Sequence, residues 1–144
     1  MLERCIDASV AVKWVLRDEM WRKKARKLLF DSIKSDIMLI APPLFEYETE
    51  SVLQERLYSG KLTITEVNVA IEKLNSVGVQ VINHIGMIKC ARDIARSFNQ
   101  SKIYDSLYAA LAELRGCEFW TADKVFYDAV RSTLLYVRYL PDYL

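Results

Sequence analysis

Short apolar runs alternate with longer helical patterns along the whole chain, and this alternation constrains the fold more than any other feature. Four runs have the length and character of strands, and a fifth, short run is a further candidate: 2–6, 36–41, 79–82, 117–121 and 134–137. Strands that are separated by helices pair in parallel, through right-handed crossovers. The sequence therefore predicts an α/β fold, with helices on both faces of a central parallel sheet of four to five strands.

The helical segments are more numerous than a minimal sheet of this kind needs. Two helices are predicted between the second and third strands, and two more between the third and fourth. The predicted segments are 8–16, a helix starting at Asp18-Glu19, 44–58, one running from a Thr63–Glu66 capping box to Gly78, one after Gly86, one from Asp105 to Gly116, and one starting at Asp123. We expect the extra helices to form an arm over one end of a single domain, residues 1–144.

The overall charge gives the chain no general attraction for nucleic acid. Twenty Lys and Arg residues face 19 Asp and Glu residues, so the net charge is only +1. Contact with a nucleic acid would need a local patch, and the second predicted helix offers a basic face at Arg22, Lys23, Lys24, Arg26 and Lys27. Such a face is either merely solvated or in contact with an RNA backbone, and the pattern leaves both interpretations open.

Cysteine and histidine usage argues against a zinc site. Cys5, Cys90 and Cys117 are widely spaced, with no C-x-x-C pattern, and the only histidine is His84. This pattern is typical of reduced thiols in a cytoplasmic protein, and we interpret His84 as structural or at the surface. No apolar run reaches the ~18 residues that a membrane span needs, so no membrane association is expected.

Acidic residues follow two of the predicted strands and open one predicted helix. Asp7 and Asp123 come after the first and fourth strands, and Asp105 begins a helix. Each could simply cap its helix. Three carboxylates meeting at one edge of the sheet would repel one another, however, and a divalent cation would relieve that repulsion. Ligation by carboxylates alone favours Mg²⁺ or Mn²⁺ over zinc.

A fourth carboxylate comes from the 44–58 helix, where Glu46, Glu48 and Glu50 are close in sequence. A helix turns about 100° per residue, so these three side chains cannot share a face. Glu48 shares its face with Leu44, Ser51 and Val52. A glutamate among largely apolar neighbours needs a partner or a metal, so Glu48 is predicted to be the inward member and Glu46 and Glu50 to face solvent.

These residues, taken together, resemble a known family. The motifs Asp7-Ala8-Ser9, Pro42-x5-Glu48-x4-Leu53, Tyr104-Asp105-Ser106-Leu107-Tyr108 and Thr121-Ala122-Asp123 are similar to those of the PIN domain, in detail to its VapC-type ribonuclease toxins. The resemblance implies a three-layer α/β/α fold and a catalytic, metal-binding set of Asp7, Glu48, Asp105 and Asp123. It also implies that Ser9 and Thr121 support this set by hydrogen bonds. Ser51 is a departure, because the subgroup often has Asn there.

The activity implied by the resemblance is hydrolysis of RNA phosphodiester bonds, with Mg²⁺ or Mn²⁺ activating water and stabilising charge on the phosphate. It further implies a type II toxin with a cognate antitoxin, as a homodimer. Four alternatives are considered. The chain could be a stand-alone RNA-processing nuclease or a metal-free PIN-like binding module. A dehalogenase-type phosphatase is disfavoured because Ser9 stands where its second Asp belongs, and a receiver domain because Asp7 lacks an acidic neighbour.

Overall fold

The computed structural model describes all residues, 1–144, and its centre is a five-stranded sheet in which every strand pair is parallel. The strands are β1 (Glu3–Ile6), β2 (Met38–Ala41), β3 (Gln80–Val81), β4 (Glu118–Thr121) and β5 (Val137–Tyr139). Their order across the sheet is β3-β2-β1-β4-β5. The chain therefore winds outward from β1 in one direction and then returns to its other side at β4. This confirms the predicted parallel α/β sheet.

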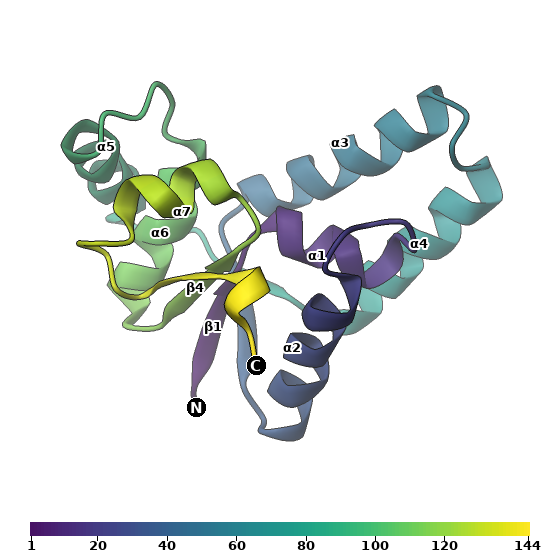
Figure 1. The fold of residues 1–144 in the computed structure, drawn as a ribbon, viewed down its shortest axis with the longest axis horizontal. Helices are drawn as coiled ribbons and strands as arrows, with labels where there is room; N and C mark the ends of the chain where they lie inside the picture. Colours follow the sequence, from purple (N-terminus) through teal and green to yellow (C-terminus); the bar gives the residue numbers. More distant parts are fainter.

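Seven helices surround the sheet: α1 (Ala8–Val15), α2 (Arg22–Lys34), α3 (Leu44–Tyr58), α4 (Ile64–Val77), α5 (Met87–Ser97), α6 (Tyr104–Arg115) and α7 (Lys124–Val130), followed by a short 3-10 helix (Leu140–Asp142). Figure 1 shows α5, α6 and α7 on one side of the sheet and α1 and α2 on the other. The pair α3 and α4 extends away from the sheet and packs against α1. The three layers agree with the prediction, but the arm consists of α3 and α4 alone, because α6 packs on β1 and β4 and α5 packs on α6.

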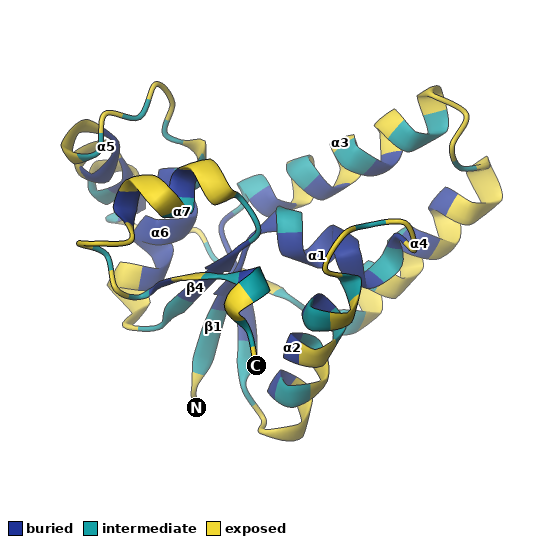
Figure 2. Ribbon diagram, in the orientation of Figure 1, coloured by how far each residue is buried: buried dark blue, intermediate teal, exposed yellow.

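Burial follows this arrangement. Figure 2 shows that buried residues lie in the strands and on the helix faces turned toward them, whereas the outer faces of α3 and α4 are exposed. The main core joins β1, β2 and β4 to α1 and α6, with Ile6, Ile40, Tyr108 and Phe119 completely buried. A separate, smaller cluster lies between α1 and the arm: Val12, Leu16, Leu53, Val67 and Ala70. The arm thus has its own apolar contact with the body.

Several local predictions agree with the structure. The arm's first helix spans Leu44–Tyr58, and its second begins at the predicted capping box. There the Thr63 hydroxyl accepts a hydrogen bond from the Glu66 amide at 3.2 Å, and the Glu66 carboxylate accepts one from the Thr63 amide at 3.0 Å. None of the helices combines the length and apolar character that crossing a membrane would need.

The predicted boundaries are wrong at three places, each for a local reason. The second helix begins at Arg22, not at Asp18-Glu19, because Trp21 adopts a left-handed backbone (φ 65°) and Arg56 holds both acidic side chains. The second strand begins at Met38 rather than 36, since Asp36 is also left-handed (φ 53°). The last strand starts only at Val137, after a turn in which the Val137 amide donates to the Leu134 carbonyl.

The small cluster between α1 and the arm generates a stability prediction. Leu53 is 1 % exposed, and its truncation leaves a cavity among α1, α3 and α4. We expect Leu53→Ala to lower the free energy of unfolding by about 2–5 kcal/mol. The exposed neighbour Gln54 is the control, and Gln54→Ala should change it by no more than about 0.5 kcal/mol. Urea denaturation measures both, and equal effects would contradict a separate apolar contact for the arm.

Candidate active site

Asp7 lies directly after β1, at the point where the direction of winding changes. Its backbone amide donates to the Trp120 carbonyl at 3.0 Å, which continues the ladder between β1 and β4. Its carboxylate accepts hydrogen bonds from the Thr121 hydroxyl at 2.7 Å and from the Ser9 amide at 3.4 Å. The residue is only 4 % exposed. Ligands of open α/β sheets bind at such a switch point, outside the carboxyl ends of the strands.

Ser9 and Thr121 connect the ends of β1 and β4. The Thr121 hydroxyl, which donates to Asp7, also accepts a hydrogen bond from the Asp123 amide at 3.0 Å. The Ser9 hydroxyl accepts one from the Ala122 amide at 3.1 Å. Each hydroxyl therefore bridges two segments that are far apart in sequence, and together they fix the orientation of Asp7 relative to the turn that carries Asp123.

Asp123 follows β4 and begins α7, where its carboxylate accepts a hydrogen bond from the Phe126 amide at 3.1 Å. Asp7 caps α1 in the same way. Both residues therefore do cap their helices, as the sequence allowed. Capping does not exclude a second role, because the cap places each carboxylate at the carboxyl edge of the sheet, beside the neighbouring strand's own acidic residue.

Asp105, in the first turn of α6, carries the clearest electrostatic sign of convergence. Burial raises its pKa most, and the charges of Asp7, Asp123 and Glu48 together with a hydrogen bond to Asp123 raise it further, to about 7. Burial alone would raise the pKa of a carboxyl group, and the three neighbouring negative charges add to that effect because they disfavour a further one. The structure thus brings all four sequence-predicted carboxylates into one neighbourhood, from four separate elements: β1, α3, α6 and the end of β4.

Glu48 is the inward member of its group of three. It is partly buried, whereas Glu46 and Glu50 are exposed. Its carboxylate accepts a hydrogen bond of 2.6 Å from the Tyr108 hydroxyl. Burial raises the pKa of Glu48, the Tyr108 hydrogen bond lowers it, and the charge of Asp7 raises it again. The predicted rotation of this helix agrees with the structure.

Tyr108 is the site residue that the sequence analysis missed. It lies on the inner face of α6 and is completely buried, with its ring stacked on Phe119 at 5.4 Å. Its hydroxyl nevertheless reaches Glu48. The available signal was spacing: Tyr108 lies three residues after Asp105, on the same side of the helix, and a buried tyrosine hydroxyl usually finds a polar partner.

The donor set agrees in chemistry with a hard divalent cation, although no three acidic, histidine or cysteine side chains are arranged to ligate one ion as they stand. All four groups supply carboxylate oxygens, the ligands that Mg²⁺ and Mn²⁺ prefer. Their mutual repulsion is the unfavourable term that a cation would remove. Binding would therefore require the side chains, above all Glu48 and Asp105, to turn toward a common point.

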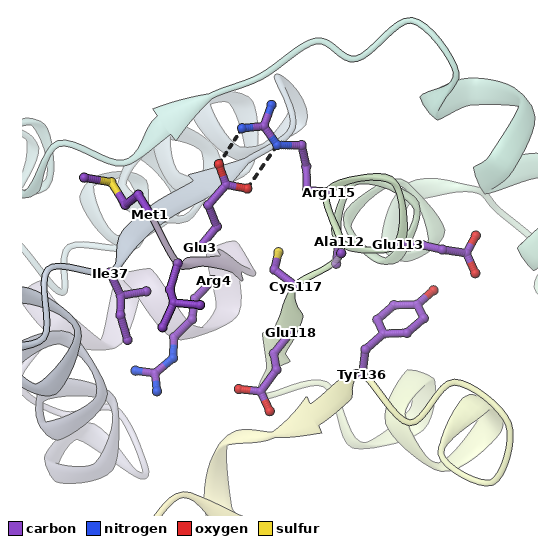
Figure 3. Close-up of a pocket in the computed structure, with 12 residues that line it drawn as sticks. Met1, Glu3, Arg4, Ile37, Ala112, Glu113, Arg115, Cys117, Glu118 and Tyr136 are labelled. Atoms are coloured by element: carbon purple, nitrogen blue, oxygen red, sulfur yellow. Dashed lines mark hydrogen bonds and ion pairs between the residues drawn. The ribbon is translucent and has the colours of Figure 1, made fainter.

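A cavity of about 610 Å³ lies at the opposite edge of the sheet, where the strands begin. Figure 3 shows Cys117, Glu118 and Tyr136 around it, with an ion pair between Glu3 and Arg115. None of the four converging carboxylates lines this cavity. Because the strands are all parallel, their beginnings are separated from the carboxylates by the full length of the sheet. We therefore assign the candidate site by its chemistry and not by the size of this cavity.

The raised pKa of Asp105 predicts how stability depends on pH without metal. Between about pH 4, the ordinary value for an unfolded aspartate, and about pH 7, the folded state holds a proton that the unfolded state has lost. The free energy of unfolding should fall as pH rises through this window. In EDTA at pH 8, Asp105→Asn should stabilise the protein by on the order of 1–2 kcal/mol after allowance for solvent screening.

Thermal melts of both proteins across this pH range would measure the effect. The difference should shrink toward zero near the acid end of the window, where Asp105 is neutral. The control is Asp142→Asn, since Asp142 is exposed and belongs to no ion pair. An Asp105→Asn protein less stable than wild type at pH 8 would show that the carboxylates do not repel one another.

The comparisons with known proteins agree with this fold. A family model described as the PIN domain matches residues 4–131. No curated protein matches the chain. Among solved structures, the crystal structure of PAE2754 from Pyrobaculum aerophilum is similar, with a TM-score of 0.64 and 18 % sequence identity over 93 % of this chain and 88 % of that one. At this identity the likeness shows the fold alone.

Members of the matched family are generally nucleases and usually bind divalent metal. The chain belongs to the PIN domain family.

Proposed function

We propose that this protein is an endoribonuclease that depends on Mg²⁺ or Mn²⁺ and hydrolyses RNA phosphodiester bonds at Asp7, Glu48, Asp105 and Asp123. The observation that carries the proposal is the convergence of four carboxylates at the switch point of the sheet, where burial and the neighbouring negative charges together raise the pKa of Asp105 to about 7. Family membership supports it independently, because PIN nucleases act on RNA. A structural role alone would not explain four mutually repelling carboxylates.

In this proposal the four carboxylates hold the cation, and each has a defined support. Thr121 and Ser9 orient Asp7, and Tyr108 orients Glu48. Asp105 must lose its proton before it can act as a ligand, so metal affinity should increase as pH rises through about 7. The bound cation supplies an activated water and stabilises charge on the phosphate oxygens. His84, the only histidine, has no role in this proposal. Its ring Nδ1 accepts a hydrogen bond from the Gly86 amide at 3.1 Å.

The biological role that we propose is the toxin of a type II toxin–antitoxin pair, acting as a homodimer in the cytoplasm. Its support is the VapC-like set of motifs, together with the frequent pairing of PIN nucleases with antitoxins. A stand-alone RNA-processing nuclease is the alternative with the same chemistry. A small DNA-binding protein encoded directly upstream would favour the toxin, and its absence would favour the stand-alone enzyme. A metal-free binding module would bind RNA but leave it intact in Mg²⁺.

Metal binding should stabilise the folded protein. A ligand at 100 times its dissociation constant adds about 2.7 kcal/mol to the free energy of unfolding. We expect Mg²⁺ or Mn²⁺ to raise the melting temperature of the wild type, and Asp7→Asn or Asp105→Asn to weaken this effect. The exposed Asp142→Asn variant should respond like wild type. If the metal-linked stabilisation is unchanged in both active-site variants, the ion binds elsewhere.

Cleavage of a labelled RNA should separate the three glutamates of α3. Glu48→Gln should lower the rate by on the order of 10²–10³, the cost of losing a catalytic electrostatic contact. Glu46→Gln and Glu50→Gln are matched controls on exposed faces of the same helix and should change the rate little. The assignment fails if Glu46→Gln is the inactive variant. It also fails if all three retain full activity, because α3 would then supply no ligand.

A further inference from the structure

The start of α2, together with the preceding turn, forms a hollow of about 600 Å³ that contains cations and no anion. Its lining consists of Arg17, Arg22, Lys23, Arg26, Lys27 and Phe30, which we call the basic hollow. Arg17, Arg22, Lys23 and Arg26 take part in none of the ion pairs of the structure. Lys24, predicted from sequence to lie on this basic face, instead donates to the carbonyls of Pro141 and Tyr143 at 2.6 and 2.9 Å.

Helix α2 would be more stable without these charges, which argues against a face that is merely solvated. Lys27 at the edge of the hollow pairs with Asp31, and Lys89 and Lys124 elsewhere likewise pair with an aspartate four residues further on, the favourable arrangement. In the basic hollow, Arg22 and Lys23 instead have Arg26 and Lys27 at that spacing, and like charges so placed destabilise a helix. The first turn of α2 also lacks acidic residues, although a helix N-terminus favours negative charge. A bound anion would offset the repulsion between these like charges and would also supply negative charge near the N-terminus of α2.

Two further observations identify the kind of anion. The Nε atom of Arg22 is buried and has no hydrogen-bond partner within the protein, so this donor is unsatisfied, and a rotation of the side chain would be needed to turn it toward an oxygen of a ligand. Phe30 is 58 % exposed, and the Arg26 guanidinium lies 5.8 Å from the centre of its ring. Cations that track phosphates, beside an exposed aromatic ring on which a base can stack, are the combination used by proteins that bind single-stranded nucleic acid.

The position of the basic hollow is compatible with a strand that also reaches the carboxylates. Helix α1 connects the two places: Asp7 caps its N-terminus and Arg17 follows its C-terminal cap, Leu16. Eight helical residues span about 12 Å at 1.5 Å each. We propose that the basic hollow binds the phosphodiester backbone of the RNA substrate at a point away from the bond that is cut, with Phe30 as a stacking surface. The identity of the ligand as RNA rests on the proposed function.

The test is binding of fluorescein-labelled oligo(U) and oligo(A) in EDTA, where no metal-dependent cleavage takes place. Arg22→Gln/Arg26→Gln should weaken both by roughly tenfold, because phosphate contacts are independent of sequence. Removing two phosphate contacts from a single strand should also reduce the slope of log K against log salt by about 1.4. Arg92→Gln/Arg96→Gln is the matched control: both residues are exposed, lie on α5 at the same spacing, and should leave affinity and slope unchanged.

Thermal melts verify folding, and Arg17→Gln/Lys23→Gln tests the same hollow if the first variant is unfolded. Oligonucleotide affinity equal to wild type in the folded variant would overturn the inference, and would point to an acidic protein as the partner of this face. Cleavage of the same RNA in Mg²⁺ by the wild type is measured separately. If RNA binds through the basic hollow but is not cut, the proposed nuclease fails and the hollow stands. If RNA is cut but binds independently of the hollow, only this inference fails.

Discussion

The hydrogen bond from the Thr121 hydroxyl to the Asp7 carboxylate joins the ends of β1 and β4, and the geometry of the site depends on it. These strands are neighbours in the sheet, but they are separated by most of the chain. Ile6 is paired with Trp120, which brings the next residues, Asp7 and Thr121, level with each other. From this seam α1 and α7 begin, and their starting positions determine where Asp123 lies.

The same contact between the ends of β1 and β4 brings buried or partly buried negative charges together, and no ion pair with a positively charged residue compensates for their repulsion. Asp7 is buried, and burial raises its pKa while the hydrogen bonds from Thr121 and Ser9 lower it. Asp105 and Glu48 add further negative charge nearby. Natural proteins break the usual rules of stability mainly at functional sites. The two places where this chain does so most clearly are the four carboxylates and the like-charged start of α2, and the proposals above give each an ionic partner of opposite sign.

Much of this could be predicted from sequence, because the signals are local. The alternation of strands and helices determines a parallel sheet, and a strand that ends just before Asp7 places that residue at the carboxyl edge. Helix geometry together with the largely apolar neighbours of Glu48 selects it over Glu46 and Glu50. The roles of these residues in catalysis remain predictions.

What sequence reasoning missed depends on long-range contacts or on unusual backbone. The sequence around Tyr108 indicates only a core residue, because its hydrogen bond is with Glu48 from another helix. The sequence around Lys24 indicates only a surface residue, because its contact is with the C-terminal segment. The late start of α2 depends on a left-handed Trp21.

Whether the four carboxylates bind one or more divalent cations is best decided by locating the ion itself. Crystals of the wild-type protein soaked in Mn²⁺ and measured for anomalous scattering would show the ion without reference to activity. We expect an anomalous peak among Asp7, Glu48, Asp105 and Asp123, and its loss in crystals of the Asp105→Asn variant. A peak only at other residues, or no peak in a protein that still cuts RNA in Mn²⁺, would contradict this expectation.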